Sequence, residues 1–479
     1  MFDILIVGAG IVGAMIAREL SQYSLRTIVI DKENDVGNVT SMANSAIVHS
    51  GYDPVPGTLK AKLNVLGNKM FPEVCKELDV SFKQIGSLTV ATEDEQLELL
   101  KELAERSAIN GVDVKLLNRD EVKAIEPYIT DDVKGALFAP SAGIVNPFTL
   151  TVHAMENAVD NGVILHLGEE VVNIQKSGEF YIVRTNKDIY KTKVIINAAG
   201  LYGDKINSMI ENIDYSINPR KGEYYVLGHL PYVFVTHTIF PLPSKKGKGI
   251  LVSPTTSLNF IVGPSSESVE SKEDLSTDKL TLVNVKKQAV NLVPKIPFGN
   301  VIRTFSGLRA TPSTHDFIIG FSKTDKNFIN TVGIESPGLA SSPAIAKYVV
   351  DEFVSKVLPL KVNENASRLI KPRIHPSKLT IDELNELIKV NPSYGRIICN
   401  CEKITLGEIE DELSRSVPPY TVKALKKRTR AGFGGCQGGF CQPAVLMLLA
   451  NHFNKDVTEV LYDKDESNIC KYETKKEAR

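Results

Sequence analysis

The first 31 residues constrain the fold more strongly than any other part of this 479-residue chain. They contain, in order, a short apolar run, a glycine-rich turn, a helical pattern, a second apolar run and an acid: Phe2–Val7, Gly8-x-Gly10-x-x-Gly13, Ile11–Leu20, Thr27–Ile30 and Asp31. This order is typical of a βαβ unit that binds a dinucleotide, whereas the glycine pattern without these neighbours would be weak evidence. We therefore expect an α/β fold with a Rossmann-like domain at the N-terminus.

Each residue of this pattern has a physical role in cofactor binding. Gly8 permits the tight turn, Gly10 lets backbone amides approach a pyrophosphate at the helix N-terminus, and Gly13 lets the helix pack closely on the strand. Asp31 can accept hydrogen bonds from the adenosine ribose. The pattern alone does not separate FAD from NAD.

A later segment favours FAD. The glycine fingerprint occurs once in the chain, and a strand pattern over Lys193–Gly200 leads into Asp204. This segment resembles the one by which two-dinucleotide-binding flavoproteins return to the FAD domain. The resemblance implies that Ala199 and Gly200 contact the cofactor.

Four cysteines near the C-terminus form two closely spaced pairs, Cys399-x-Cys401 and Cys436-x4-Cys441. Thiolates at such spacings can hold a redox-active iron-sulfur centre, and the surrounding glycines let a loop wrap a cluster with its amides turned toward sulfur. A structural zinc site is the alternative, although the common Cys-x2-Cys zinc pairs differ from these spacings. We favour a [2Fe-2S] cluster, and we interpret Cys75 and Cys470 as ordinary thiols.

Composition limits the kinds of binding partner and the cellular location that we expect. The formal net charge is −1, so nothing indicates nucleic-acid binding, and we expect the short basic run Lys426–Arg428 to form a solvated face. No apolar stretch reaches the roughly 18 residues of a transmembrane span. Six cysteines without a signal peptide predict a reduced, cytoplasmic protein. Peripheral docking at the inner face of the membrane stays open.

Two resemblances to known families become specific at this point. Residues 1 to about 360 resemble the FAD-dependent glycerol-3-phosphate dehydrogenase and oxidase group of the D-amino-acid-oxidase-like superfamily. Residues 397 to about 450 resemble the bacterioferritin-associated-ferredoxin-type [2Fe-2S] domain. Together they imply FAD and a [2Fe-2S] cluster as cofactors, oxidation of sn-glycerol 3-phosphate to dihydroxyacetone phosphate, and electron transfer to a redox partner subunit or a quinone.

The oxidation of a secondary alcohol by a flavin needs a base for the hydroxyl proton, and histidine suits this role. The segment Asn44–Gly51 resembles the loop of glycerol-3-phosphate oxidases in which a histidine lies by the flavin. The resemblance implies that His49 is the base and that Asn44 and Ser45 contact the cofactor. Ala46 replaces the usual glycine, and alanine tolerates a positive φ poorly.

An anionic substrate needs fixed positive charge, and Arg309, in the superfamily-like segment Gly307–Pro312, offers a planar fork suited to phosphate. A structural ion pair is the alternative role for Arg309. The oxidase resemblance adds Lys248 as a second cation, unless Lys246 takes its place or both lie on a solvated hairpin tip. The same superfamily implies that a helix starting at Gly338 and Leu339 turns its amides toward the flavin.

We expect three domains. The predicted FAD-binding domain comprises residues 1–75, 145–210 and 296–358, and an inserted antiparallel substrate sheet comprises residues 76–144 and 211–295. A linker over residues 359–396 precedes a small helical cluster domain over residues 397–479. We predict four further helices: Glu93–Asn110 capped by Thr92, Pro147–Asp160 capped by Asn146, a helix to Leu413 opened by Thr405-x-x-Glu408, and Pro443–Phe453.

Two alternative functions remain at this stage. The segment His49–Lys60 also resembles the corresponding loop of L-2-hydroxyglutarate dehydrogenases, whose substrate is another anionic secondary alcohol. The chain could instead be an electron-transfer subunit, with the catalytic flavin on a partner chain.

Overall fold

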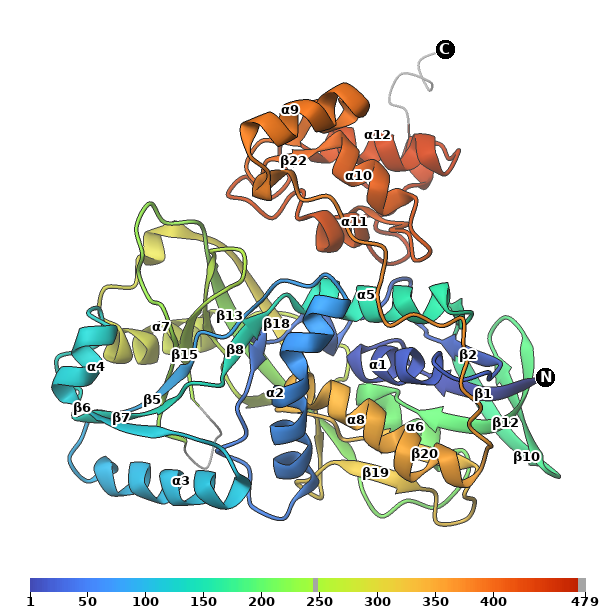
Figure 1. Cartoon of the computed structure of the whole chain (residues 1–479), viewed down its shortest axis with the longest axis horizontal. Coiled ribbons are helices and arrows are strands. Elements are labelled where there is room, and N and C mark those ends of the chain that lie inside the picture. The colour runs from blue at the N-terminus through green and yellow to red at the C-terminus, as the bar shows by residue number, and fades with distance from the viewer. Residues whose placement is uncertain (244–248, 473–479) are drawn as a thin grey trace.

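The first sheet grows from the N-terminal βαβ unit, as the pattern predicts. The computed structural model describes residues 1–243 and 249–472. β1 pairs in parallel with β2 and with β12 and so lies inside an eight-stranded sheet (Figure 1). The strands are β1 Phe2–Val7, β2 Thr27–Ile30, β9 Ile164–His166, β10 Val171–Ser177, β11 Phe180–Thr185, β12 Ile189–Asn197, β19 Ile318–Phe321 and β20 Phe328–Val332.

Helices cover this sheet because its central strands are apolar on both faces. Every residue of β2 is buried, and α1 packs against both α5 and α8 in the main hydrophobic core. The helices of this part are α1 Ile11–Leu20, α2 Leu59–Glu77, α5 Pro147–Asp160, α6 Gly203–Ser208 and α8 Gly338–Glu352. The predicted bounds of β1, α1 and β2 are confirmed.

The second sheet has nine strands and is antiparallel except where β5 and β14 pair in parallel. These two strands come from the two separate stretches that were predicted to form one sheet. The strands are β5 Ser87–Ala91, β6 Lys115–Asn118, β7 Gly135–Ala139, β13 Ile217–Leu227, β14 Thr238–Pro241, β15 Leu251–Pro254, β16 Phe260–Gly263, β17 Glu267–Ser268 and β18 Val301–Pro312. Three helices accompany it: α3 Gln96–Asn110, α4 Arg119–Ile125 and α7 Lys279–Leu292.

A small sheet joins these two parts and carries the loop of the predicted base. β8 (Gly143–Val145) pairs with both β3 (Ile47–Val48) and β4 (Phe82–Lys83). His49 therefore follows directly after the short strand β3, which is held in place by its pairing with β8.

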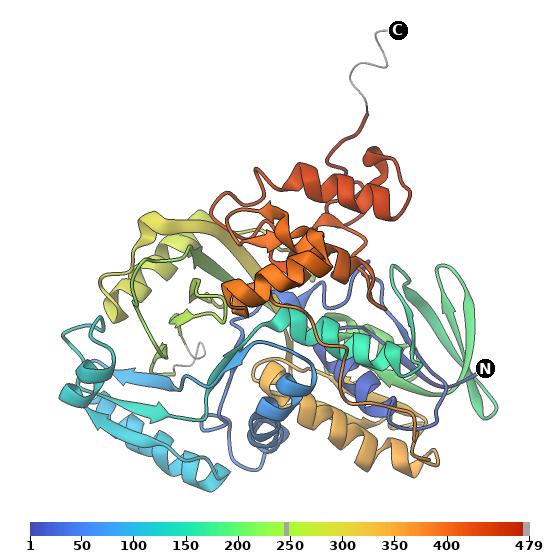
Figure 2. The same ribbon diagram turned by 45° about the horizontal axis from the view of Figure 1, so that its top comes forward.

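The C-terminal part forms a small, mainly helical domain with a hydrophobic core of its own. It lies across α5 of the larger body, and its helix α11 packs against α5 (Figures 1 and 2). Its elements, with the preceding helix α9, are α9 Ile381–Val390, β21 Ile397–Cys399, β22 Ile404–Thr405, α10 Leu406–Leu413, α11 Val422–Thr429 and α12 Gln442–His452.

Two of the three predicted capping residues are confirmed and one is wrong. The Asn146 side chain accepts hydrogen bonds from two backbone amides of α5, and Thr405 and Glu408 form the predicted capping box of α10. The predicted cap at Thr92 is wrong, because residues 93–95 form a turn and α3 begins at Gln96. The backbone amide of Thr92 instead donates to Gln96 Oε1 at 2.8 Å.

The expectation of a solvated basic face over Lys426–Arg428 is wrong. All three residues are buried, because α11 turns this face toward the FAD-type sheet and places Lys427 and Arg428 against the carboxylate of Asp35. None of the helices over residues 1–243 and 249–472 combines the length and the apolar character needed to cross a membrane.

Candidate cofactor and substrate site

A cleft of about 180 Å³ opens at the carboxyl end of β1, where the glycine fingerprint leads into α1. Five residues with a predicted cofactor role border it: Gly8, Gly10, Asp31, Ala199 and Gly200. Residues 37–41 form another wall. Ligands of α/β sheets bind outside the carboxyl ends of the strands, so the position of this cleft matches that of a dinucleotide site.

The fingerprint glycines fit a bound pyrophosphate because they hold the turn close to its neighbours. A Cβ atom on Gly8, whose φ is +109°, would lie 2.4 Å from the Ala198 carbonyl oxygen. One on Gly13 would lie 2.0 Å from the Gly8 carbonyl oxygen. Gly13 thus acts through helix packing, while Gly8 and Gly10 leave the cleft open to a ligand.

Asp31 combines a structural contact with a position on the cleft. Its Oδ2 accepts a hydrogen bond from the Ala9 amide at 2.6 Å, and its Oδ1 accepts one from the Glu33 amide at 2.8 Å. Burial raises the pKa of this carboxyl group to about 6. A carboxyl at this edge fits the hydroxyl donors of a ribose.

The Asn44 side chain holds the loop around the predicted base. Its Nδ2 donates to the Ser41 carbonyl at 2.8 Å, and its Oδ1 accepts from the Ala46 amide at 2.8 Å. Ser45 Oγ lies 3.0 Å from the hydroxyl of Tyr224 on β13. Neither Asn44 nor Ser45 borders the cleft, so any contact that they make with a cofactor lies beyond it.

Ala46 adopts the left-handed conformation that the glycine of the resembling loop would favour, with a φ of +59°. We expect Ala46→Val to lower stability by about 1–2 kcal/mol, because a β-branched side chain is strained in this region. Ala46→Gly is the matched control and should preserve stability. Thermal release of FAD followed by fluorescence would measure the difference, and equal melting of the two variants would contradict the assigned strain.

His49 lies between helix α2 and strand β14 of the second sheet. Its backbone carbonyl accepts hydrogen bonds from the side-chain amides of Asn64 at 2.7 Å and Asn68 at 3.2 Å, both on α2. Its ring is half-buried and packs against Phe240 of β14 with 5.8 Å between centroids. The main chain of His49 is therefore anchored independently of its imidazole.

Arg309 lies on β18 of the second sheet, directly across from Arg220 on β13. Its guanidinium donates to the Ser265 carbonyl at 3.4 Å, and no carboxylate among the described residues forms a salt bridge with it. The structure thus does not support the ion-pair alternative, and the half-buried charge can attract an anion. The second predicted cation, Lys248, and its substitute Lys246 lie outside the described residues.

The helix predicted to face the flavin is α8, and it begins at Gly338 with Leu339 in its first turn. α8 packs on α2 and on β3, the strand that precedes His49. The approach to α2 is close, since a Cβ atom on Gly67 would lie 2.1 Å from the Ala340 carbonyl oxygen. Gly338 and Leu339 do not border the cleft at Asp31.

The four C-terminal cysteines come together as two pairs. The sulfur atoms of Cys401 and Cys436 are 3.6 Å apart, and the thiols of Cys399 and Cys441 contact each other. Within the described residues, no three or more His, Cys, Asp or Glu side chains are placed so that they could hold one metal ion. Two cysteines for each of two irons is the ligand set of a [2Fe-2S] cluster, whereas structural zinc needs four ligands around one ion.

The loop around the cysteines is compact and has cations beside it. A Cβ atom on Gly434 would lie 2.3 Å from Cys401 Cβ, so only glycine lets the loop approach this cysteine. The Lys426 ammonium lies 4.7 Å from the ring centroid of Phe433, and burial, with nearby Arg303, lowers its pKa to about 8. Cations beside the loop favour the negative charge that four thiolates carry.

Sequence reasoning missed two residues that shape the cleft. Ser41 Oγ accepts a hydrogen bond from the Ile11 amide at 2.9 Å, and Asn38 borders the cleft while contacting the C-terminal domain. Neither residue belongs to a motif, because each acquires its role from a segment distant in the chain.

Comparisons with known proteins cover both cofactor-binding regions of the chain. The family described as FAD dependent oxidoreductase matches residues 3–352, and the BFD-like [2Fe-2S] binding domain matches residues 397–451. The glycerol 3-phosphate dehydrogenase of Caloramator mitchellensis is 46% identical over 100% of both chains. The mitochondrial L-2-hydroxyglutarate dehydrogenase of Arabidopsis thaliana is 28% identical over 74% of this chain and 83% of its own.

A solved structure supports the same assignment. The dithionite-reduced L-α-glycerophosphate oxidase of Mycoplasma pneumoniae, with FAD bound, matches with a TM-score of 0.74 and 31% identity over 78% of this chain and 99% of that chain. The predicted fold class and the two predicted cofactors, FAD and a [2Fe-2S] cluster, are confirmed. The chain belongs to the FAD dependent oxidoreductase family, in its group of glycerol 3-phosphate dehydrogenases and oxidases, and carries a BFD-like [2Fe-2S] domain after the flavoprotein part.

Proposed function

We propose that this protein is a dehydrogenase that oxidises sn-glycerol 3-phosphate to dihydroxyacetone phosphate and passes the electrons through its [2Fe-2S] cluster to an external acceptor. The observation that carries the proposal is the full-length relationship, at 46% identity, to a glycerol 3-phosphate dehydrogenase with both cofactor regions included. In this proposal residues 1–75, 145–210 and 296–358 bind FAD, and residues 76–144 and 211–295 form the substrate sheet, except that β18 of the third FAD stretch pairs with β13 and so belongs to the substrate sheet.

The residues of the chain have distinct tasks in this reaction. FAD, when bound, supplies the acceptor for the hydride that leaves C2 of the substrate. An imidazole nitrogen of His49 takes the proton of the C2 hydroxyl, so that a carbonyl forms as the hydride departs. Arg309 holds the phosphate through charge-assisted hydrogen bonds and so orients C2, with Lys248 as a second cation.

The presence of a cluster favours a dehydrogenase over an oxidase. A [2Fe-2S] cluster accepts single electrons, which an enzyme that hands electron pairs directly to oxygen does not need. Cys401 is exposed, and Phe440, between the last two cysteines, is 87% exposed. Exposure of this edge supports electron exit to a redox partner subunit or a quinone. If the acceptor is a quinone, we propose that this protein is cytoplasmic and docks peripherally at the inner face of the membrane.

An anaerobic absorbance spectrum before and after addition of glycerol 3-phosphate tests the proposal. We expect the flavin band to bleach and the cluster bands to follow. Bleaching by L-2-hydroxyglutarate but not by glycerol 3-phosphate would instead favour the 2-hydroxy-acid dehydrogenase. A flavin that no hydroxy acid reduces would favour an electron-transfer subunit.

The role of Arg309 leads to a separate prediction. A hydrogen bond to a charged group contributes about 1.5–3 kcal/mol, so we expect Arg309→Met to lower kcat/KM for glycerol 3-phosphate by about 10- to 100-fold, mainly through KM. Arg184→Met, which replaces an exposed arginine on β11, is the control and should leave KM unchanged. Equal effects of the two substitutions on anaerobic flavin reduction would rule out a specific phosphate contact at Arg309.

A further inference from the structure

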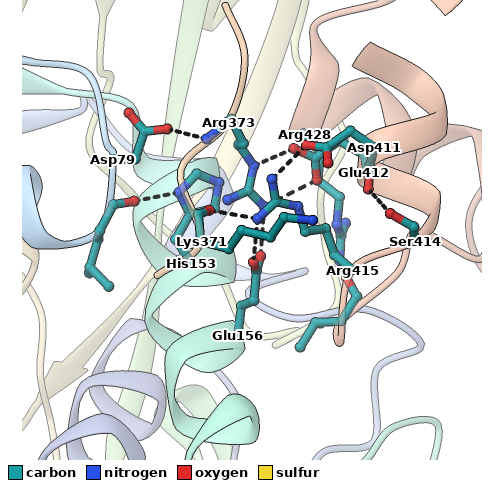
Figure 3. Close-up of polar contacts among 12 residues, drawn as sticks. Asp79, His153, Glu156, Lys371, Arg373, Asp411, Glu412, Ser414, Arg415 and Arg428 are labelled. Atoms are coloured by element: carbon teal, nitrogen blue, oxygen red, sulfur yellow. Dashed lines mark hydrogen bonds and ion pairs between the residues drawn. The ribbon is translucent and has the colours of Figure 1, made fainter. Parts of the chain in front are cut away.

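Two sets of buried ion pairs join the C-terminal domain to the flavoprotein part. The first surrounds Glu156 of α5 (Figure 3). Its carboxylate pairs with Arg373 at 2.6 Å and with Arg415 at 3.4 Å. Arg373 also pairs with Glu412 of α10, and Arg415 pairs with Asp411 of the same helix at 2.6 Å. The carboxylate of Glu156 in the flavoprotein part thus binds two arginines, and each arginine also pairs with an acidic residue of α10 in the cluster domain.

The second set surrounds Asp35, in the loop after β2. Its two carboxylate oxygens pair with Lys427 at 2.6 Å and with Arg428 at 2.8 Å, both on α11. Lys427 also donates to Asn38 Oδ1 at 3.1 Å, and Asn38 borders the FAD cleft. The helix that precedes the cysteine loop is therefore attached directly to a wall of the cofactor site.

Burial decides what these contacts do. The side chains of Glu156, Arg373, Asp35 and Arg428 are at most 7% exposed. Buried ion pairs seldom stabilise a fold more than apolar contacts of the same volume would, but breaking one leaves an unpaired buried charge, which is strongly unfavourable. The two sets of ion pairs lie on different elements of the flavoprotein part. If the cluster domain tilted or lifted away, several buried charges would lose their partners at once. The pairs therefore specify one orientation of the domain.

Electron tunnelling depends steeply on the distance between donor and acceptor, so a fixed orientation determines its rate. We propose that Asp35 and Glu156 are positioning residues that hold the cluster domain over the FAD-site loop, so that electrons pass from flavin to cluster within one chain without domain movement. The inference rests on the proposed function for the direction of electron flow. Each step moves one electron from reduced flavin to the cluster, which takes one of its two ferric ions to ferrous. Two steps, each followed by reduction of one equivalent of an external one-electron acceptor, reoxidise the flavin, and its protons pass to solvent.

The double variant Asp35→Asn/Glu156→Gln tests this role, because it removes both charges with little change in side-chain volume. In anaerobic stopped-flow experiments on the full chain, we expect glycerol 3-phosphate to bleach the flavin at the parental rate. We expect the subsequent cluster reduction to slow by at least about 10-fold, because loss of both sets of ion pairs lowers the population of the docked state. Glu98→Gln, in an exposed pair with Lys101, is the control and should change neither phase.

Further measurements separate this role from misfolding and from an error in the proposed substrate. FAD, iron and sulfide contents should match the parent, and proteolysis within residues 359–396 should accelerate in the double variant. Asp35→Glu and Glu156→Asp, introduced together, keep both charges and should recover part of the lost rate of cluster reduction. Photochemical reduction of the flavin replaces the substrate, so failure of glycerol 3-phosphate to react would refute the proposed function alone. Cluster reduction at the parental rate in the double variant would refute the positioning role.

Discussion

Cys401→Ser should abolish the [2Fe-2S] absorbance bands and the reduction of external acceptors, while glycerol 3-phosphate should still bleach the flavin. This is the result that we expect, because Cys401 and Cys436 form one of the two sulfur pairs. Loss of an outer-shell partner alone lowers metal affinity by about 10- to 100-fold, so loss of a ligand should leave little cluster bound. Iron and acid-labile sulfide per flavin, with anaerobic spectra, measure the outcome.

The matched control for this substitution is Cys470→Ser. Cys470 packs against the core of the same domain but belongs to neither sulfur pair. We expect the control to keep its cluster and its acceptor reduction. A Cys401→Ser protein with full iron and sulfide content would remove Cys401 from the ligand set.

His49→Gln should slow anaerobic flavin reduction by glycerol 3-phosphate by about 10²- to 10⁴-fold, the usual contribution of a positioned general base. FAD content should not change, because Asn64 and Asn68 bind the backbone carbonyl of His49 and not its ring. Glutamine keeps a polar side chain beside Phe240 of β14 but does not take up a proton. Single-turnover stopped-flow absorbance isolates this step from later electron transfer.

The control for this experiment is His452→Gln, at the end of α12 in the cluster domain. It should leave the flavin-reduction rate unchanged. A decrease of less than about 10-fold in His49→Gln would contradict the role of His49 as the base, since general-base removal usually costs at least 100-fold.

Local patterns predicted the elements that depend on neighbours in the chain. The βαβ fingerprint specified β1, α1 and β2, because the turn, the helix packing and the terminal acid all lie within 31 residues. The capping residues Asn146 and Thr405 marked helix starts for the same reason, since a cap bonds amides two or three residues away. Thr92 failed where an intervening turn shifted the start of α3 by three residues.

Contacts between residues far apart in the chain could be identified only from the tertiary structure. Nothing near Lys427 and Arg428 in the chain indicates burial, because their partner Asp35 precedes them by about 390 positions and compensates their charges only after docking. The parallel pairing of β5 with β14 likewise joins two stretches that the chain separates.

The amino-acid sequence by itself therefore determined the two cofactors, because the glycine and cysteine spacings, together with the family resemblances of the segments around them, indicated FAD and a [2Fe-2S] cluster. Only the tertiary structure decided the placement of the cluster domain on the flavoprotein part and the left-handed conformation of Ala46. Spacing records contacts between near neighbours, whereas burial, charge compensation and strained backbone conformations depend on segments that meet only in the folded chain.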